Sequence, residues 1–227
     1  GLDHVPASVI VLGGGVIGCE FASVWRSFGA EGPIVEALPR LVPPEDEASS
    51  KVLERAFRKR GIKLRTGTAF ESVARTDNGV AVTVAGGDVL EAELLLVAVG
   101  RGPVTDDLGY AEAGLTLDRG FVTTDDHLRT NLPHTYAVGD IVPGLQLAHR
   151  GFQQGIFVAE EIAGQAPAPI DESGIPRVTY SHPEVASVGL TEAQAVERFG
   201  AEAVTTTTYD LGGNGKSQIL KTAGFVK

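Results

Sequence analysis

A short apolar run that leads directly into a glycine-rich turn constrains this chain more than any other feature. Residues 8–12 (Ser-Val-Ile-Val-Leu) have the β-branched content and the length of a buried strand. Glycines then follow at the spacing G-x-G-x-x-G, and the segment after them predicts a helix over residues 16–28. The apolar positions of this helix fall on one face: Ile17, Phe21, Val24, Trp25 and Phe28.

Each glycine of the motif has a physical role. Gly13 permits a tight turn, Gly15 lets a pyrophosphate approach bare backbone, and Gly18 lets the helix pack closely on the strand. The free N–H groups at the start of the helix favour an anion. A second short strand, residues 34–35, ends at Glu36, at the spacing expected of an acid that binds an adenosine ribose. The combination predicts a dinucleotide site, and a glycine-rich turn without a ligand is the alternative.

The entry to the second strand departs from the pattern. Gly32 and Pro33 stand where β-branched residues are expected, and proline cannot donate to a central ladder. We therefore expect a shortened or distorted strand, which can displace Glu36.

Composition restricts the class of protein. The chain has 227 residues, a formal net charge of −10 and no apolar run of membrane-spanning length. The charge disfavours nucleic acid and anionic membranes as partners. Cys19 is the only cysteine, so neither an intrachain disulfide nor a cysteine-rich metal site is expected. A buried role is expected for Cys19, and a reactive thiol at the helix N-terminus is the alternative. No targeting segment is visible, and we expect a cytoplasmic protein.

The rest of the chain continues an α/β pattern with one interruption. A helix over 45–60 and a strand at 62–64 precede three strands at 69–75, 80–85 and 89–92, which tight turns join into an antiparallel meander. A strand that is apolar on both faces follows at 94–99. Later elements are a short strand at 136–138, a helix ending at Gly164, a linker at 165–169, strands at 178–180 and 186–188, a capped helix from Thr191, and a strand-like final part including 205–208.

Several motifs in order resemble one family, the pyridine-nucleotide disulfide oxidoreductases. The matching segments are residues 11–20, 97–101, 135–140, 147–149 and 180–189. The resemblance implies a Rossmann-like NAD-binding domain with a β-meander over residues 1–125 and the returning part of an FAD-binding domain over 126–169. It also implies the start of an α+β dimerisation domain over 170–227. The absence of methionine and the chain's two ends lead us to expect an internal piece of a longer protein.

The resemblance also implies roles for individual residues. The residues that would bind NAD are Gly13, Gly14, Gly15, Val16, Ile17, Gly18, Glu36, Phe70, Ala98, Val99, Gly100 and Arg101. Those that would bind FAD are Asp140, Leu147 and Ala148. Glu20 would lie near the contact between flavin and nicotinamide. Arg40 does not indicate NADP, because NAD-dependent relatives also carry an arginine there. No metal site is expected.

Within the family the chain is most similar to the enzymes that oxidise dihydrolipoamide with FAD and NAD as the E3 component of 2-oxo acid dehydrogenase complexes. The implied partners are a lipoyl domain and a second copy of the parent chain. Mercuric ion reductase, nucleotide transhydrogenase and a non-enzymatic module that binds NADH and flavin are the alternatives. The redox cysteine pair, the first FAD glycine motif and the acid–base histidine have no counterpart in this chain, so we expect the chain alone to be inactive.

Overall fold

The structure, a computed structural model, describes residues 2–227 and divides into two compact units. The first unit contains the chain up to Gly100 together with Pro176–Lys227, and the second contains Arg101–Ile175. The domain boundaries predicted after residues 125 and 169 stay a prediction. Both units mix helices and strands, as the predicted α/β class requires.

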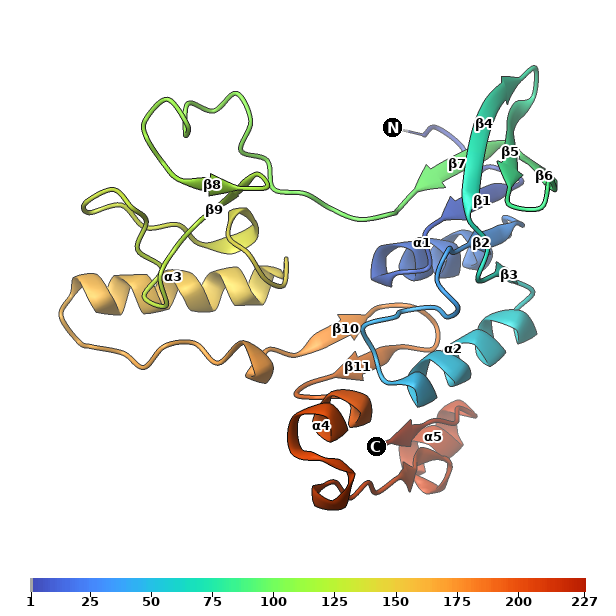
Figure 1. Cartoon of the computed structure of the whole chain (residues 1–227). Coiled ribbons are helices and arrows are strands. Elements are labelled where there is room, and N and C mark those ends of the chain that lie inside the picture. Colours follow the sequence, from blue (N-terminus) through green and yellow to red (C-terminus); the bar gives the residue numbers. More distant parts are fainter. Residues whose placement is uncertain (1) are drawn as a thin grey trace. The chain divides into compact units, whose positions relative to one another are not determined.

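A parallel sheet of four strands forms the centre of the first unit (Figure 1). Its strands, in spatial order, are β3 (Lys63–Arg65), β2 (Pro33–Val35), β1 (Val9–Leu12) and β7 (Leu94–Val97). Every neighbouring pair is parallel, with Val11 opposite Ile34 and Leu96. Two helices connect strands of this sheet, α1 (Val16–Ser27) and α2 (Glu47–Lys59). The predicted strand–turn–helix–strand unit is confirmed.

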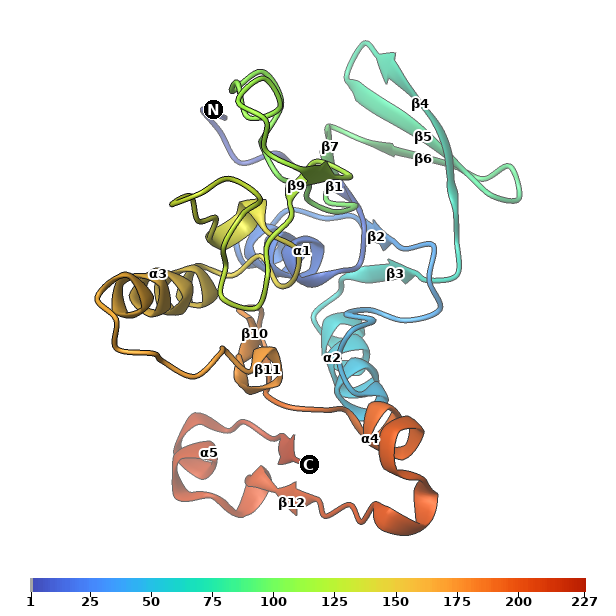
Figure 2. The same cartoon turned by 60° about the vertical axis from the view of Figure 1, so that its left-hand side comes forward.

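An antiparallel meander separates β3 from β7. It consists of β4 (Phe70–Thr76), β5 (Gly79–Val84) and β6 (Val89–Ala92), and Figure 2 shows the three strands side by side. The turns between them are the ones that the Asp-Asn-Gly and Gly-Gly pairs predict.

The central strand β1 buries side chains on both of its faces. Val9 and Val11 belong to the core that the helices cover, with Leu53 and Phe57 of α2. Ile10 and Leu12 belong to a second core that contains residues of the meander, Val82 and Val84 among them. Full burial of such side chains stabilises the fold by about 1.5–3 kcal/mol each. The β1 strand is therefore apolar throughout because helices and meander cover opposite faces of the sheet.

The predicted apolar face of α1 is not its buried face. Phe21 and Val24 are each 44% exposed and Phe28 is 65% exposed. The residues that face the core are small: Gly18, Cys19, Ala22 and Ser23. Close packing of α1 on the sheet leaves room only for small side chains at the contact, so Phe21, Val24 and Phe28 lie outward, and Trp25 alone of the large predicted side chains beyond Ile17 packs against the core. On α2, likewise, Leu53 and Phe57 are buried but Val52 is 40% exposed.

The irregular entry to β2 shortens this strand, as expected. Pro33 is its first residue, the one strand position that tolerates the missing N–H. Gly32 has φ +143°, and a Cβ there would overlap the carbonyl of Val9. The strand nevertheless keeps its register with β1 and β3, and the backbone N–H of Glu36 donates to Arg65 O at 2.9 Å.

The C-terminal part of the first unit carries small elements. These are β10 (Arg177–Thr179), β11 (Val185–Ser187), α4 (Glu192–Phe199), β12 (Tyr209–Asp210), α5 (Gly215–Leu220) and β13 (Phe225–Val226). The capping box of Thr191 and Gln194 is present at the start of α4. The strand-like prediction for the final part is wrong at residues 205–208, which form no strand, but it is confirmed at β12 and β13, which pair antiparallel on either side of α5. Asn214 stabilises that turn of helix by accepting from Lys216 N–H.

The second unit has its own small core around Val122, Ala137 and Val142. Its elements are the hairpin β8 (Leu117–Asp118) and β9 (Phe121–Val122), the 3₁₀ turn at Gly139–Ile141, α3 (Ala148–Ile162) and the 3₁₀ turn at Glu172–Gly174. The predicted strand at 136–138 is reduced to a single bridge between Arg129 and Tyr136. None of the helices within residues 2–227 is long and apolar enough to cross a membrane.

Candidate nucleotide-binding site

The glycine turn after β1 is closely packed everywhere except at one point. Gly13 has φ +109°, and a Cβ there would overlap the backbone of Ala98. A Cβ on Gly18 would overlap the carbonyl of Gly13, so α1 can approach the turn only with glycine at this position. Gly15, by contrast, has no atom within 4 Å of a Cβ position and begins α1 without a side-chain cap. The backbone of the turn is therefore accessible at Gly15, whereas Gly13 and Gly18 on either side are closely packed.

Glu36 lies against this turn at the end of β2. Its carboxylate accepts hydrogen bonds from the Gly14 N–H at 2.5 Å and from the Leu38 N–H at 2.7 Å. The side chain is half-buried, and a carboxylate has further acceptor sites beyond two such bonds. The second strand, although short, thus places the side chain of Glu36 against the glycine turn.

Sequence reasoning missed the loop between β2 and α2. Leu41 and Val42 are fully buried, and Val42 N–H donates to Gly14 O at 2.8 Å. A Cβ on Gly14 would lie 2.6 Å from Leu41 Cδ2, which explains a glycine at a position the motif leaves open. The apolar Leu41-Val42 pair in this loop was the available signal, but nothing in the sequence says which surface it covers.

Glu20, predicted near the reacting rings, contacts another segment in this structure. Its Oε1 accepts from Tyr180 N–H at 2.8 Å, and one turn further along α1 Ser23 Oγ accepts from His182 N–H at 2.9 Å. Arg60, which follows the last residue of α2, donates to both Ser23 Oγ and His182 O. The outer part of α1 is thus joined to the segment 180–182. The pairing of Glu20 with these residues was not foreseen.

The thiol of Cys19 is not exposed to solvent or ligand. It is fully buried and donates to Gly14 O at 3.4 Å. Burial raises the pKa of the thiol to about 12. The expected buried role is confirmed, and the reactive alternative does not fit this environment.

The remaining predicted residues divide between the two units. Ala98, Val99 and Gly100 follow β7 in the first unit, where Ala98 N–H donates to Leu12 O at 2.7 Å beside the glycine turn. Phe70, 38% exposed, begins β4. Arg101 opens the second unit, which also contains Asp140, Leu147 and Ala148. Asp140 is exposed on a 3₁₀ turn, and α3 begins at Ala148 without an acidic side chain in its first turn.

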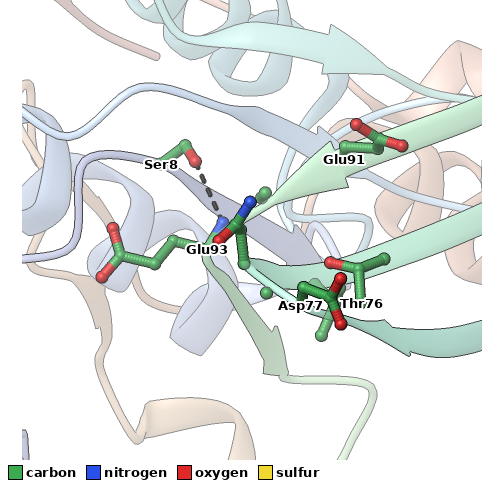
Figure 3. A pocket seen from close by; sticks show the side chains of 9 residues that line it. Ser8, Thr76, Asp77, Glu91 and Glu93 are labelled. Atoms are coloured by element: carbon green, nitrogen blue, oxygen red, sulfur yellow. Dashed lines mark hydrogen bonds between the residues drawn. The ribbon is translucent and has the colours of Figure 1, made fainter.

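A separate open depression of about 720 Å³ lies between β1 and the meander (Figure 3). Asp77, Glu91 and Glu93 line it, and Glu93 N–H donates to Ser8 Oγ at 3.0 Å. Its lining residues include no cation. A nucleotide phosphate therefore has no favourable partner there, unlike at Gly15.

Comparison with known proteins decides the family. The model of the pyridine nucleotide-disulphide oxidoreductase family matches residues 2–155, and that of the dimerisation domain of the same family matches residues 175–227. The chain belongs to this family.

Relatives within the family are similar over the whole chain. The dihydrolipoyl dehydrogenases of Chlorobaculum tepidum and Bacillus subtilis are each 40% identical over 100% of this chain and 49% of their own length. The structure of LpdA from Mycobacterium tuberculosis is 31% identical, with a TM-score of 0.88, over 99% of this chain and 49% of that one. The chain spans about half the length of the curated relatives it matches.

The family uses NAD and FAD as cofactors. A further structural relative, the HOCl-induced flavoprotein disulfide reductase RclA from Escherichia coli, is 27% identical with a TM-score of 0.89, over 100% of this chain and 53% of its own. The family is one of oxidoreductases, and the fold of this chain recurs in both structural relatives.

Proposed function

We propose that this chain is the NAD-binding and adjoining part of a flavoprotein that oxidises dihydrolipoamide to lipoamide with NAD. The observation that carries the proposal is the whole-chain similarity to dihydrolipoyl dehydrogenases together with a glycine turn that is open only at Gly15. The substrate follows from the names of those relatives. The nucleotide follows from the residues at the turn.

The residues of the first unit fit NAD. The open backbone of Gly15 and the first N–H groups of α1, at Val16, Ile17 and Gly18, suit a pyrophosphate. Glu36 suits the adenosine ribose, because its carboxylate accepts hydroxyl hydrogen bonds and repels a 2′-phosphate. We assign the remaining NAD contacts to Gly13, Gly14, Phe70, and to Ala98, Val99, Gly100 and Arg101 after β7.

The second unit fits one part of FAD. We assign Asp140 to the ribityl chain and Leu147 and Ala148 to backbone contacts at the start of α3. This unit is held together near the site by Gln154, whose Oε1 accepts from Gly139 N–H at 2.7 Å. When bound, FAD supplies the hydride acceptor that amino-acid side chains lack. The role of this chain is to bind and orient the two cofactors, and we assign Glu20 to the region between them.

Two other activities within the family use the same NAD unit. Mercuric ion reduction and transhydrogenation between nucleotides stay alternatives, as does a flavin- and NADH-binding protein without a redox disulfide. The relatives described as dihydrolipoyl dehydrogenases favour the first proposal.

The complete reading frame around these residues provides the test. We expect it to contain a Cys-x4-Cys pair upstream and to catalyse NAD-dependent oxidation of dihydrolipoamide. Glu36→Ala is expected to raise KM for NAD about tenfold, the effect of one charge-assisted hydrogen bond, with little change in KM for dihydrolipoamide. A frame without the cysteine pair, or one that turns over only mercuric ion, would overturn the proposal.

For assembly, we propose a homodimer through the region after residue 170, supported by the match to the dimerisation domain. The lipoyl domain of a 2-oxo acid dehydrogenase complex is the proposed protein partner. A cytoplasmic location, and the absence of nucleic acid or membrane partners, stay predictions from composition.

A further inference from the structure

Arg40 makes several hydrogen bonds that hold the loop between β2 and α2 in place. Arg40 is half-buried, and its Nη1 donates to Glu45 O at 2.8 Å and to Ser50 Oγ at 2.7 Å. Its Nη2 donates to Pro43 O at 2.6 Å. Ser50 Oγ in turn donates to Leu41 O at 2.7 Å. The guanidinium therefore closes the loop on itself and attaches it to the first turns of α2.

The same loop forms the back of the proposed nucleotide site. Leu41 and Val42, next to Arg40 in the chain, are the residues that pack on Gly14 and bond to its carbonyl. Glu36 bonds to Gly14 N–H from one carboxylate oxygen and to Leu38 N–H of the loop from the other. Displacement of the loop would therefore disturb both the glycine turn and the direction in which Glu36 points.

These contacts leave Arg40 poorly suited to bind a phosphate. A bidentate phosphate complex uses two adjacent N–H donors of the guanidinium. Both N–H groups of Nη1 and one of Nη2 already donate within the loop. Only Nε–H and one N–H of Nη2 remain for a 2′-phosphate, which would also meet the negative charge of Glu36.

From this geometry we infer that Arg40 is a positioning residue for the adenosine half of the dinucleotide, acting through the loop 37–46 and Glu36. The inference rests on the proposed function, since it assumes that a dinucleotide binds at the glycine turn. Arg40 then contributes indirectly to the preference for NAD over NADP, because it keeps Glu36 in place and does not itself contact the ligand.

Titration of the 227-residue chain with NADH, NADPH and ADP-ribose tests the inference. In Arg40→Ala we expect NADH and ADP-ribose to bind about tenfold more weakly, and the preference for NADH over NADPH to shrink. If Arg40 instead received a 2′-phosphate, the variant would lose affinity for NADPH alone and its preference for NADH would grow. That result would overturn the inference.

Two further variants separate geometry from charge. Ser50→Ala removes an anchor of the loop without changing any charge, so we expect a smaller loss of NADH affinity in the same direction. Arg40→Lys keeps the charge but not the planar set of donors, so we expect it to resemble Arg40→Ala. Arg55→Ala, an exposed arginine of α2, is the matched control and should bind NADH as the parent chain does. Full recovery in Arg40→Lys would contradict the inference.

Hydrogen exchange without nucleotide tests the positioning step separately. In Arg40→Ala we expect the amides of Gly14, Leu38 and Val42 to exchange at least tenfold faster, while amides of β1 keep their protection. Unchanged exchange at these three amides would overturn the inference even if NADH binding fell. If the parent chain bound no nucleotide, the proposed function would fail, and the exchange result would still decide the role of Arg40 in the loop.

Discussion

Burial decides the chemistry of Cys19. The thiol lies beneath the glycine turn, and its pKa is raised to about 12 because burial disfavours the thiolate. We expect iodoacetamide at pH 8 to modify the native chain on the order of 1,000-fold more slowly than the chain unfolded in urea, since only the thiolate reacts. A mass-spectrometric time course measures the two rates, and equal rates would contradict the assignment.

The same shift has a consequence for stability. The pKa of the folded thiol lies above its ordinary value of 9.0, so the fold favours the neutral thiol. Its contribution to stability is complete below about pH 9 and is lost as the pH rises towards 12. Cys19→Ala should therefore remove part of the alkaline decrease in stability between these values, as followed by Trp25 fluorescence.

We propose that Glu36 controls which nucleotide the chain accepts. Its carboxylate faces the glycine turn, where it can accept from ribose hydroxyls and repel a 2′-phosphate. We expect the parent chain to prefer NADH to NADPH. Glu36→Ala should weaken NADH binding about tenfold and reduce the difference in affinity between NADH and NADPH. Nucleotide fluorescence titrations measure this. Glu31→Ala, an exposed acid before β2, is the control. Equal affinity for both nucleotides in the parent chain would contradict the role of Glu36.

At the scale of elements, Arg60 joins α2, α1 and the segment 180–182. It donates to Ser23 Oγ, Ser27 Oγ and His182 O at 2.7–2.9 Å, and Arg26 Nε donates to its carbonyl at 2.7 Å. Burial, with the neighbouring charge of Arg26, lowers the pKa of this guanidinium. The contacts are hydrogen bonds to backbone and hydroxyl groups, and no carboxylate compensates the charge among them.

Because Arg60 joins these elements, we expect the free energy of unfolding to be sensitive to truncation of its side chain. We expect Arg60→Ala to lower the free energy of unfolding by about 1.5–3 kcal/mol, because Ser23 and the 180–182 backbone lose a charged partner. Arg55→Ala, on the exposed side of the same helix, should change it by less than about 0.5 kcal/mol. Urea titrations followed by the fluorescence of Trp25 measure the stability of the first unit, because Trp25 packs against the core of that unit. Equal effects in the two variants would show that the link is not stabilising.

At the scale of the whole molecule, the proposed NAD residues up to Gly100 lie in one unit, and Arg101 lies in the other together with only part of the FAD residues. We expect it to bind NADH weakly, to copurify without a yellow chromophore, and to show no lipoamide-dependent turnover. A single cysteine cannot cycle between dithiol and disulfide within the chain. An absorbance spectrum and a turnover assay measure both properties. Stoichiometric flavin, or turnover abolished by Glu36→Ala, would contradict this prediction.

Association of the chain is expected to be poor or nonspecific. Several large apolar side chains of the C-terminal region are exposed, including Phe199, Ile219 at 81% and Leu220. The complete parent, in contrast, should form a homodimer through the region after residue 170. Analytical ultracentrifugation of both forms tests this, and a tight, discrete dimer of the 227-residue chain would contradict it.

Local patterns were sufficient for most of the first unit. The β-branched run before Gly13, the two hairpin turns and the Thr191–Gln194 capping box each act over a few residues, and the structure contains all of them. The errors arose where packing outweighs local preference. The threonines at 205–208 favour a strand, but no partner strand pairs with them, and the 136–138 strand keeps one bridge for the same reason.

The sequence by itself determined the order of strand, glycine turn, helix and acid, because the steric limit at Gly18 is set by the carbonyl of Gly13, a near neighbour in the chain, whereas the limit at Gly13 is set by the distant Ala98. Only the tertiary structure decided which side of α1 is buried, because that depends on how closely the helix approaches the sheet. It also decided that Leu41 covers Gly14, that Arg40 closes the loop behind Glu36, and that Glu20 meets Tyr180. These contacts join residues far apart in sequence or through loops without periodicity, and no local pattern encodes them.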